Sequence, residues 1–250
     1  MDLFSFKKIS VLILFTFSCS VGSAQKLYPI YELGGSMGTF IYQGDLTPSL
    51  QGSYRHLTPT GQLYGALILT PNITFRGNFT MGNISGADAW ITNSSWRPQR
   101  HLSFTTSIHE FSGTLALNNF RYNMDGSFKR LSFYLFFGAG LSYLDVRRNW
   151  QGINTSIFTP ATSVGIGLGI DTNHIPPKFI PVIPFGFGVR YALLGNSLSI
   201  AFEFTYRKIF TDYLDGFSYA GNPKNMDEYY NYSIGIIYTK YKKILKCPTF

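Results

Sequence analysis

Leu131-Ser-Phe-Tyr-Leu-Phe-Phe-Gly-Ala-Gly-Leu-Ser-Tyr143 places large apolar residues at the odd positions and small, polar or aromatic residues at the even ones. A period of two indicates a β-strand, because successive side chains of a strand point to opposite faces. The same alternation recurs along the chain, with aromatic residues near the ends of the segments. This pattern is typical of a membrane-spanning barrel whose apolar face meets lipid and whose polar face lines the lumen. We therefore predict an all-β fold, a closed antiparallel transmembrane β-barrel.

The composition fits a barrel of the outer membrane. The chain has 250 residues, of which 17% are aromatic and only 14% are charged. Soluble domains carry about 25% charged residues. Beyond the N-terminal region no stretch offers the roughly 18 apolar residues that a membrane helix needs. A chain that is apolar but lacks such a helix favours a β-barrel over a soluble β-sandwich.

The N-terminal segment resembles an export signal. Lys7 and Lys8 form a short basic region, residues 9–17 are apolar, and small residues precede Ala24. These are the three parts of a secretory signal peptide. We predict a signal peptide over residues 1–24, cleavage between Ala24 and Gln25, and one barrel domain over residues 25–250.

The cysteines and the net charge limit the other function classes. Acylation at Cys19 is the alternative to cleavage after Ala24, but the residues before Cys19 lack the usual lipoprotein pattern. After cleavage Cys247 stands alone, so neither an intrachain disulfide nor a cysteine metal site is expected. The net charge of +8 suits anionic lipid head groups or simply solvated loops. We predict no cofactor, no metal site and no nucleic-acid partner.

The segments predict about eight strands and an orientation. They cover residues 31–42, 62–69, 73–84, 102–120, 131–146, 180–193, 198–210 and 229–241. Long and short connections alternate, as in bacterial barrels with long extracellular loops and short periplasmic turns. Both ends of an even-stranded barrel then lie in the periplasm. Such a small barrel is filled by side chains, which argues against a general porin, although ten strands remain an alternative.

Two segments fit the pattern poorly. In 102–120, Phe104 and Ile108 are even while Phe111 is odd, and a β-bulge near His109 would explain the change of phase. The long stretch 147–179 is irregular, and residues 163–169 within it form either an extra strand or an ordered loop.

The parity of the strands predicts charged side chains inside the lumen. Acids and arginines in a narrow barrel can pair and occlude it. We expect a structural ion-pair network that seals the barrel, with a gated ion path as the alternative. The six predicted members are Glu32, Arg76, Glu110, Arg190, Glu203 and Arg207.

Three aspartates follow the outer ends of two strands that the closed barrel brings near each other. Asp45, Asp212 and Asp215 are a candidate partner or cation site at the outer rim, since hard cations prefer oxygen ligands. The alternative is that these carboxylates only cap turns.

The predicted outer loops also carry basic residues. Phosphates of lipopolysaccharide would be accessible to them, although a solvated charged loop explains the same residues. The basic residues are Arg97, Arg100, Arg147, Arg148 and Lys178.

A weak pattern raises the question of catalysis. His101, Ser103 and Glu110 resemble the histidine, serine and acid of lipid A deacylase barrels. A nucleophile needs its base within hydrogen-bond reach, and three common residues at loose spacing are weak support. We therefore predict that the protein is not an enzyme.

Several segments together resemble the PorG-like outer-membrane barrels of bacteria with type IX protein secretion. They are Tyr42-Gln-Gly-Asp-Leu46, Phe75-Arg-Gly-Asn-Phe79, Gly82-Asn-Ile-Ser-Gly86, Ile108-His-Glu-Phe111, Pro184-Phe-Gly-Phe-Gly-Val-Arg-Tyr-Ala192 and Arg207-Lys-Ile-Phe-Thr-Asp-Tyr-Leu-Asp215. The resemblance implies a non-enzymatic component or anchor of the secretion machinery that meets periplasmic secretion-ring proteins. The rival interpretation is an OmpA-like structural or adhesive barrel without a secretion role.

Overall fold

The eight strands of the molecule close into one antiparallel barrel. The computed structural model describes residues 30–47, 52, 54, 56–70, 72–91, 94–119, 130–193, 197–221 and 226–240. The predicted signal peptide, the Ala24–Gln25 bond, the turn at 123–129, Cys19 and Cys247 lie outside these residues. Within them, no helix combines the length and the hydrophobicity needed to cross a membrane.

Each strand pairs with its neighbours in the sequence, and the last strand returns to the first. The barrel closes where β1 and β8 pair from Tyr31 opposite Lys240 to Gln43 opposite Glu228. The strands are β1 (Ile30–Gln43), β2 (Thr58–Ile68), β3 (Ile73–Ala87), β4 (Ser103–Asn119), β5 (Leu131–Asn149), β6 (Phe179–Ala192), β7 (Leu198–Ile209) and β8 (Glu228–Lys240). The prediction of a closed all-β barrel with eight strands is confirmed.

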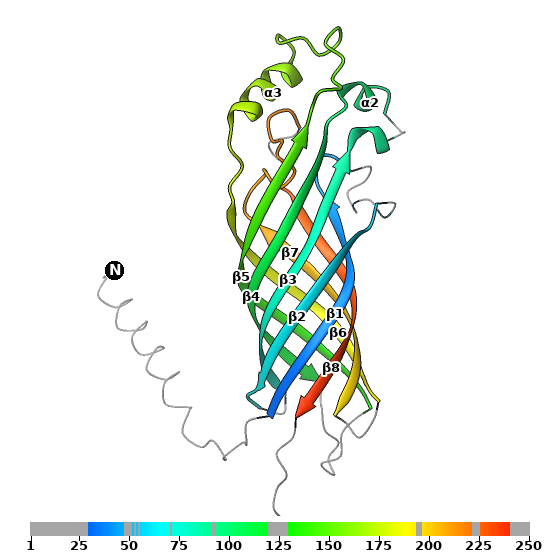
Figure 1. Cartoon of the computed structure of the whole chain (residues 1–250), viewed down its shortest axis with the longest axis vertical. Helices are drawn as coiled ribbons and strands as arrows, with labels where there is room; N and C mark the ends of the chain where they lie inside the picture. The colour runs from blue at the N-terminus through cyan, green and yellow to red at the C-terminus, as the bar shows by residue number, and fades with distance from the viewer. Residues whose placement is uncertain are drawn as a thin grey trace, which may run out of the picture.

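The two ends of the barrel differ (Figure 1). At the end here called the loop end, the chain forms the 3₁₀ helix η2 (Asp88–Trp90) and the α-helices α2 (Arg97–Arg100) and α3 (Ser163–Asn173). At the opposite turn end β1 begins and β8 stops, and β2 passes to β3 within a few residues.

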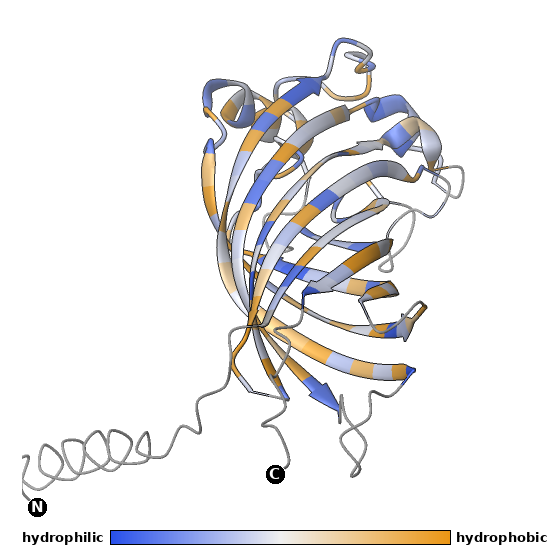
Figure 2. Cartoon of the chain, turned by 60° about the horizontal axis from the view of Figure 1, so that its bottom comes forward, coloured by the Kyte–Doolittle hydropathy of each residue, from blue (hydrophilic) through white to orange (hydrophobic). Residues whose placement is uncertain are grey.

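The alternating residues of the sequence point alternately to the outer wall and to the lumen of the barrel. Along β5 the odd side chains are exposed outside and most even ones are buried, and Figure 2 shows hydrophobic and hydrophilic residues alternating along the strands. Aromatic residues mark both rims of the outer wall, as at transmembrane barrel interfaces. Tyr31, Tyr191 and Tyr238 are exposed near the turn end, and Tyr143 packs on Phe179 toward the loop end.

The predicted bulge near His109 is wrong. β4 keeps one unbroken register with both β3 and β5 along its whole length. Phe104 and Ile108 point inward and are buried in an apolar core at the loop end. The apparent change of phase arises because the interior becomes apolar there, while the backbone remains regular.

Further features differ from the prediction, and β3 and β5 each run three residues beyond their predicted ends, to Ala87 and Asn149. β2 begins at Thr58 rather than at Gln62. Residues 163–169 form neither an extra strand nor an ordered loop, because they belong to α3, which is capped by the Thr162 hydroxyl accepting from the Gly165 N–H.

Candidate functional site

The lumen holds the six charged residues that the parity of the strands placed there. They form three buried ion pairs, each between strands that are not neighbours. Arg190 on β6 donates to both oxygens of Glu32 on β1, at 2.8 and 3.2 Å. Glu32 also accepts from the Thr239 hydroxyl on β8. The pair therefore ties three strands together close to the turn end.

A second pair lies next to the first. Arg76 on β3 donates to both oxygens of Glu203 on β7, at 2.8 and 3.4 Å. The Tyr134 hydroxyl donates to the same carboxylate at 2.5 Å, and the Arg76 guanidinium lies 4.0 Å from the centre of the Tyr64 ring. Gly34 leaves the space for this ring, since a Cβ there would lie 2.2 Å from it. Aromatic rings and paired charges thus fill this level of the lumen.

The third pair lies nearer the loop end. Arg207 on β7 donates through Nε to Glu110 on β4 at 2.6 Å and through Nη1 to Asn231 on β8 at 2.6 Å. The Tyr229 hydroxyl also donates to Glu110. Each of the six charged side chains is at most 9% exposed. Removal of one partner would leave an uncompensated charge in a low-dielectric interior.

Between the charged levels the lumen is polar. Ser36 and Gln62 are paired across β1 and β2, and Gln62 faces Thr80 across β2 and β3. One buried oxygen of each of these three side chains has no protein hydrogen-bond partner. Buried polar groups of this kind are normally satisfied by ordered water.

An apolar core closes the loop end. It combines inward-facing side chains of seven strands with residues of the segment 210–221, here called the mouth loop. Its buried members are Phe40, Tyr42, Leu46, Ile84, Leu102, Phe104, Ile108, Leu144, Ile180, Val182, Ile209, Leu214, Phe217, Ala220 and Tyr229. Leu214, Phe217 and Ala220 are at most 1% exposed. The mouth loop therefore acts as a plug above the charged levels.

The three aspartates predicted at the rim lie near one another at this mouth. Asp215 is fully buried, whereas Asp212 is partly exposed. Partial burial raises the pKa of Asp212 to about 6, and the charges of Asp45 and Asp171 act in the same direction. Among the described residues, no group of three or more His, Cys, Asp or Glu side chains is arranged to hold a metal ion. A partner-binding role of the three aspartates remains a proposal.

Sequence reasoning missed two further aspartates at the mouth. Asp171 on α3 accepts from the N–H groups of Ser218, Tyr219 and Ala220. Asp227 Oδ1 lies 2.6 Å from the Tyr42 hydroxyl oxygen, and Asp227 Oδ2 accepts from the Leu214 N–H. Neither follows from strand parity, since Asp171 lies on an unpredicted helix and Asp227 just precedes β8.

Most loop arginines bind the protein itself. Arg100 pairs with Asp88 and donates to the Ala220 carbonyl, and Arg148 donates to the carbonyls of Asp171 and Gly216. Arg97 donates to two carbonyls of residues 45–47. The prediction that these three arginines offer free charges to lipopolysaccharide phosphates is therefore not supported. Arg147 remains exposed beside Asp145, and Lys178 is also exposed.

The residues of the deacylase-like pattern do not form a site. Ser103 is at the start of β4 and faces outward, whereas Glu110 faces the lumen and pairs with Arg207. At about 3.3 Å per strand residue, seven residues separate them by roughly 20 Å. His101 is exposed at the end of α2 in a left-handed conformation.

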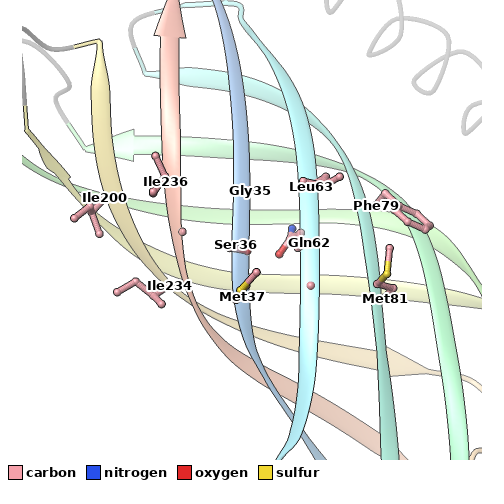
Figure 3. A pocket seen from close by; sticks show the side chains of 12 residues that line it. Gly35, Ser36, Met37, Gln62, Leu63, Phe79, Met81, Ile200, Ile234 and Ile236 are labelled. Atoms are coloured by element: carbon pink, nitrogen blue, oxygen red, sulfur yellow. The ribbon is translucent and has the colours of Figure 1, made fainter.

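The outer wall carries an apolar groove of about 570 Å³ over β1, β2, β3, β7 and β8. Figure 3 shows the side chains that line it, with Met37, Leu63 and Met81 on the outer side of their strands. Leu63 is 62% exposed and Met37 is 78% exposed. The groove thus opens toward the surroundings of the barrel, where acyl chains suit its lining better than a polar substrate does.

The closed fold, the lipid-compatible wall and the filled lumen define a small eight-stranded β-barrel of the outer-membrane type. The chain belongs to the family described as "Domain of unknown function (DUF6089)", whose model matches residues 7–246. This description does not include the PorG-like group. No curated protein sequence matches the chain.

Solved structures of outer-membrane barrels are similar in fold. The attachment invasion locus protein Ail of Yersinia pestis, solved with the heparin analogue sucrose octasulfate, is 9% identical. The match covers 86% of this chain and all of Ail, with a TM-score of 0.46. Neisserial surface protein A is 11% identical over 83% of this chain and 96% of its own, with a TM-score of 0.43. The outer membrane enzyme PagL is 8% identical over 83% and 98%, with a TM-score of 0.34.

Proposed function

We propose that the protein is a sealed, non-enzymatic barrel of the bacterial outer membrane that serves as a component or anchor of the type IX protein secretion machinery. The proposal that the barrel is not a channel rests on its filled lumen, which contains three buried ion pairs below an apolar plug. A barrel with this interior offers its partners a fixed surface and offers solutes no passage.

The secretion role rests on the resemblance to PorG-like barrels, and some of the resembling segments contact one another in the fold. The segments Tyr42–Leu46 and 207–215 meet where the Tyr42 hydroxyl oxygen lies 2.8 Å from Asp215 Oδ2. The segment Ile108–Phe111 meets 207–215 through the Arg207–Glu110 pair. Three of the six resembling segments, far apart in the sequence, thus contact one another inside the barrel.

The orientation follows from the connections. Export by the proposed signal peptide, residues 1–24, delivers the chain to the periplasm, and short turns of bacterial barrels stay on that side. The turn end would then face the secretion-ring proteins; of its predicted short connections, 70–72, 123–129 and 194–197, only residues 70, 72 and 197 lie within the described part of the chain. The loop end, with α3 and the mouth loop, would face the cell exterior.

Affinity capture after crosslinking in intact envelopes tests the anchor role. The tagged barrel should recover periplasmic ring proteins, identified by native mass spectrometry, whereas another tagged eight-stranded barrel should not. Asn72 and Thr155 are both exposed, at the turn end and in the loop after β5 respectively. Asn72→Arg should reduce the recovery and Thr155→Arg should leave it unchanged. Recovery of no ring protein in mild detergent would refute the secretion role.

One observation favours an OmpA-like adhesive or structural role as the second candidate. Four isoleucines of the segment that follows β5 are exposed at the loop end, which is unusual for a solvated loop. They are Ile157, Ile166, Ile170 and Ile175, the last of them 82% exposed. In this alternative the barrel presents α3 outward to other surfaces, and its relevant contacts are outer-membrane lipid and lipopolysaccharide rather than secretion rings.

A further inference from the structure

The mouth loop is held in the barrel by contacts from several separate elements. The Thr106 hydroxyl on β4 donates to the Leu214 carbonyl at 2.6 Å. Arg100 of α2 and Arg148 of β5 donate to the carbonyls of Ala220 and Gly216. These contacts bind the backbone of the loop and leave its buried carboxylate, Asp215, to be satisfied in another way.

Asp215 and Asp227 meet at a single hydroxyl group. The Tyr42 hydroxyl lies 2.8 Å from Asp215 Oδ2 and 2.6 Å from Asp227 Oδ1. Gly44 makes this approach feasible, since a Cβ there would lie 2.0 Å from the Tyr42 oxygen and 2.2 Å from Asp227 Oδ1. The remaining oxygens accept backbone N–H groups, Phe217 donating to Asp215 and Leu214 to Asp227.

A tyrosine hydroxyl carries only one hydrogen, so it can donate to only one of the two carboxylates. The second short contact is a hydrogen bond only if the other carboxyl group is protonated and donates to the tyrosine oxygen. Both aspartates are at most 1% exposed. Among the described residues, neither forms an ion pair with a lysine or an arginine.

The surrounding charges act against ionisation of both carboxyl groups. Burial raises the pKa of Asp215 well above its usual range, and the neighbouring Asp227 and Asp45 raise it further. Burial likewise raises the pKa of Asp227, with additional effects of Asp212 and Asp45.

Among the described residues around the loop, several other charged groups already have partners. Arg97 donates to the Asp45 and Thr47 carbonyls, Asp88 pairs with Arg100, and Lys208 pairs with Glu228. Asp171 accepts three N–H groups of the mouth loop. No cation among these groups is left to neutralise the two buried carboxylates.

We propose that Asp215 and Asp227 share one proton through Tyr42 and form a pH-sensitive latch that keeps the mouth loop in the barrel. When the shared proton leaves, two buried negative charges face each other and one short hydrogen bond is lost. The closed loop is therefore stable at acidic and neutral pH and is released as the pH rises through the ionisation of the pair.

Limited proteolysis of the full-length barrel in phospholipid vesicles tests the latch. Cleavage within residues 210–221 is measured by mass spectrometry from about pH 6 to about pH 10, relative to an unstructured peptide at each pH. The wild type should be protected at the acidic end, and its cleavage rate should rise by at least roughly tenfold, which corresponds to one unit of pKa. A profile that stays flat would refute the latch.

Isosteric variants separate the latch from ordinary packing. In Asp227→Asn or Asp215→Asn the amide supplies the hydrogen permanently and removes one charge, so the loop should stay protected at every pH. Asp145→Asn, an exposed carboxylate of the same end, should behave as the wild type. Retention of the wild-type profile by either latch variant would refute the proposal. Infrared spectra of the wild type at neutral pH should show the band of a protonated carboxyl group. Absence of this band would also refute the proposal, and this measurement needs no variant.

Discussion

Arg76 shows how single residues hold this barrel closed. Its side chain is 2% exposed, lies over the Tyr64 ring and donates twice to Glu203. A charged group at such a place is tolerated only while its partner is present, because its loss leaves a buried carboxylate unpaired. The stability of this part of the lumen therefore depends on Arg76 and Glu203 being present together.

The variant Arg76→Met should lower the free energy of unfolding by about 3–5 kcal/mol. Tryptophan fluorescence during urea unfolding in vesicles measures this change as a lower midpoint at constant slope. The double variant Arg76→Met with Glu203→Leu should recover most of the loss, because it removes both charges. Arg147→Met is the matched control, since its side chain is 80% exposed, and should change stability by no more than about 0.5 kcal/mol. Equal stability of Arg76→Met and Arg147→Met would contradict the account.

Strand parity was sufficient to place the lumen residues but not to pair them. Because side chains alternate between faces, the sequence indicates that Glu203 and Arg207 face inward from β7. Their partners come from β3 and β4 on the other side of the lumen. Which side chains can reach each other across the lumen depends on the diameter and closure of the barrel. The mouth aspartates have no period at all, so the Tyr42 contact to Asp215 could not be predicted.

Helix α3 shows the limits of pattern reading at the scale of an element. Gly165, Gly167 and Gly169 alternate with apolar residues and therefore resemble a strand. The helix is fixed by its Thr162 cap and by packing, since a Cβ on Gly167 would lie 2.2 Å from the Tyr219 carbonyl oxygen. Tertiary contacts override the local pattern here.

Two glycine substitutions in α3 should have opposite effects. Gly169→Ala meets no atom within 4 Å and should stabilise the helix by about 0.5–1 kcal/mol. Gly167→Ala collides with the mouth-loop backbone and should loosen both segments. Hydrogen exchange of residues 163–173 and 210–221 reports each change. Faster exchange in Gly169→Ala, or unchanged exchange in Gly167→Ala, would show that α3 does not pack as described.

Strand β4 also departs from the simple pattern of apolar residues facing lipid. Its residues Phe104 and Ile108 are apolar but face inward, because the interior itself changes from polar to apolar along the barrel axis. If every apolar residue is assigned to the lipid-facing side, Phe104 and Ile108 can be placed there only by a β-bulge, which the structure does not contain. The sequence shows the period-two pattern of β4. It does not show that the lumen becomes apolar toward the loop end, because that core includes residues of the mouth loop, which only the folded structure brings there.

At the scale of the whole molecule, closure was predictable, whereas the sequence left the choice between eight and ten strands open. Eight alternating segments and connections of alternating length leave few other arrangements for an apolar chain without a membrane helix. The proposed sealing of the lumen rests on three ion pairs and an apolar core whose residues come from separate parts of the sequence. Only the assembled barrel brings them together.

Conductance of the purified protein in planar lipid bilayers tests the sealed barrel most directly. Insertion is verified beforehand by protection of the strands from protease, and a general porin serves as the conducting control. At neutral pH the account predicts no stable open channel at either polarity, because three buried ion pairs and an apolar core at the loop end obstruct the lumen. Long-lived openings of uniform conductance from the wild-type protein would contradict it.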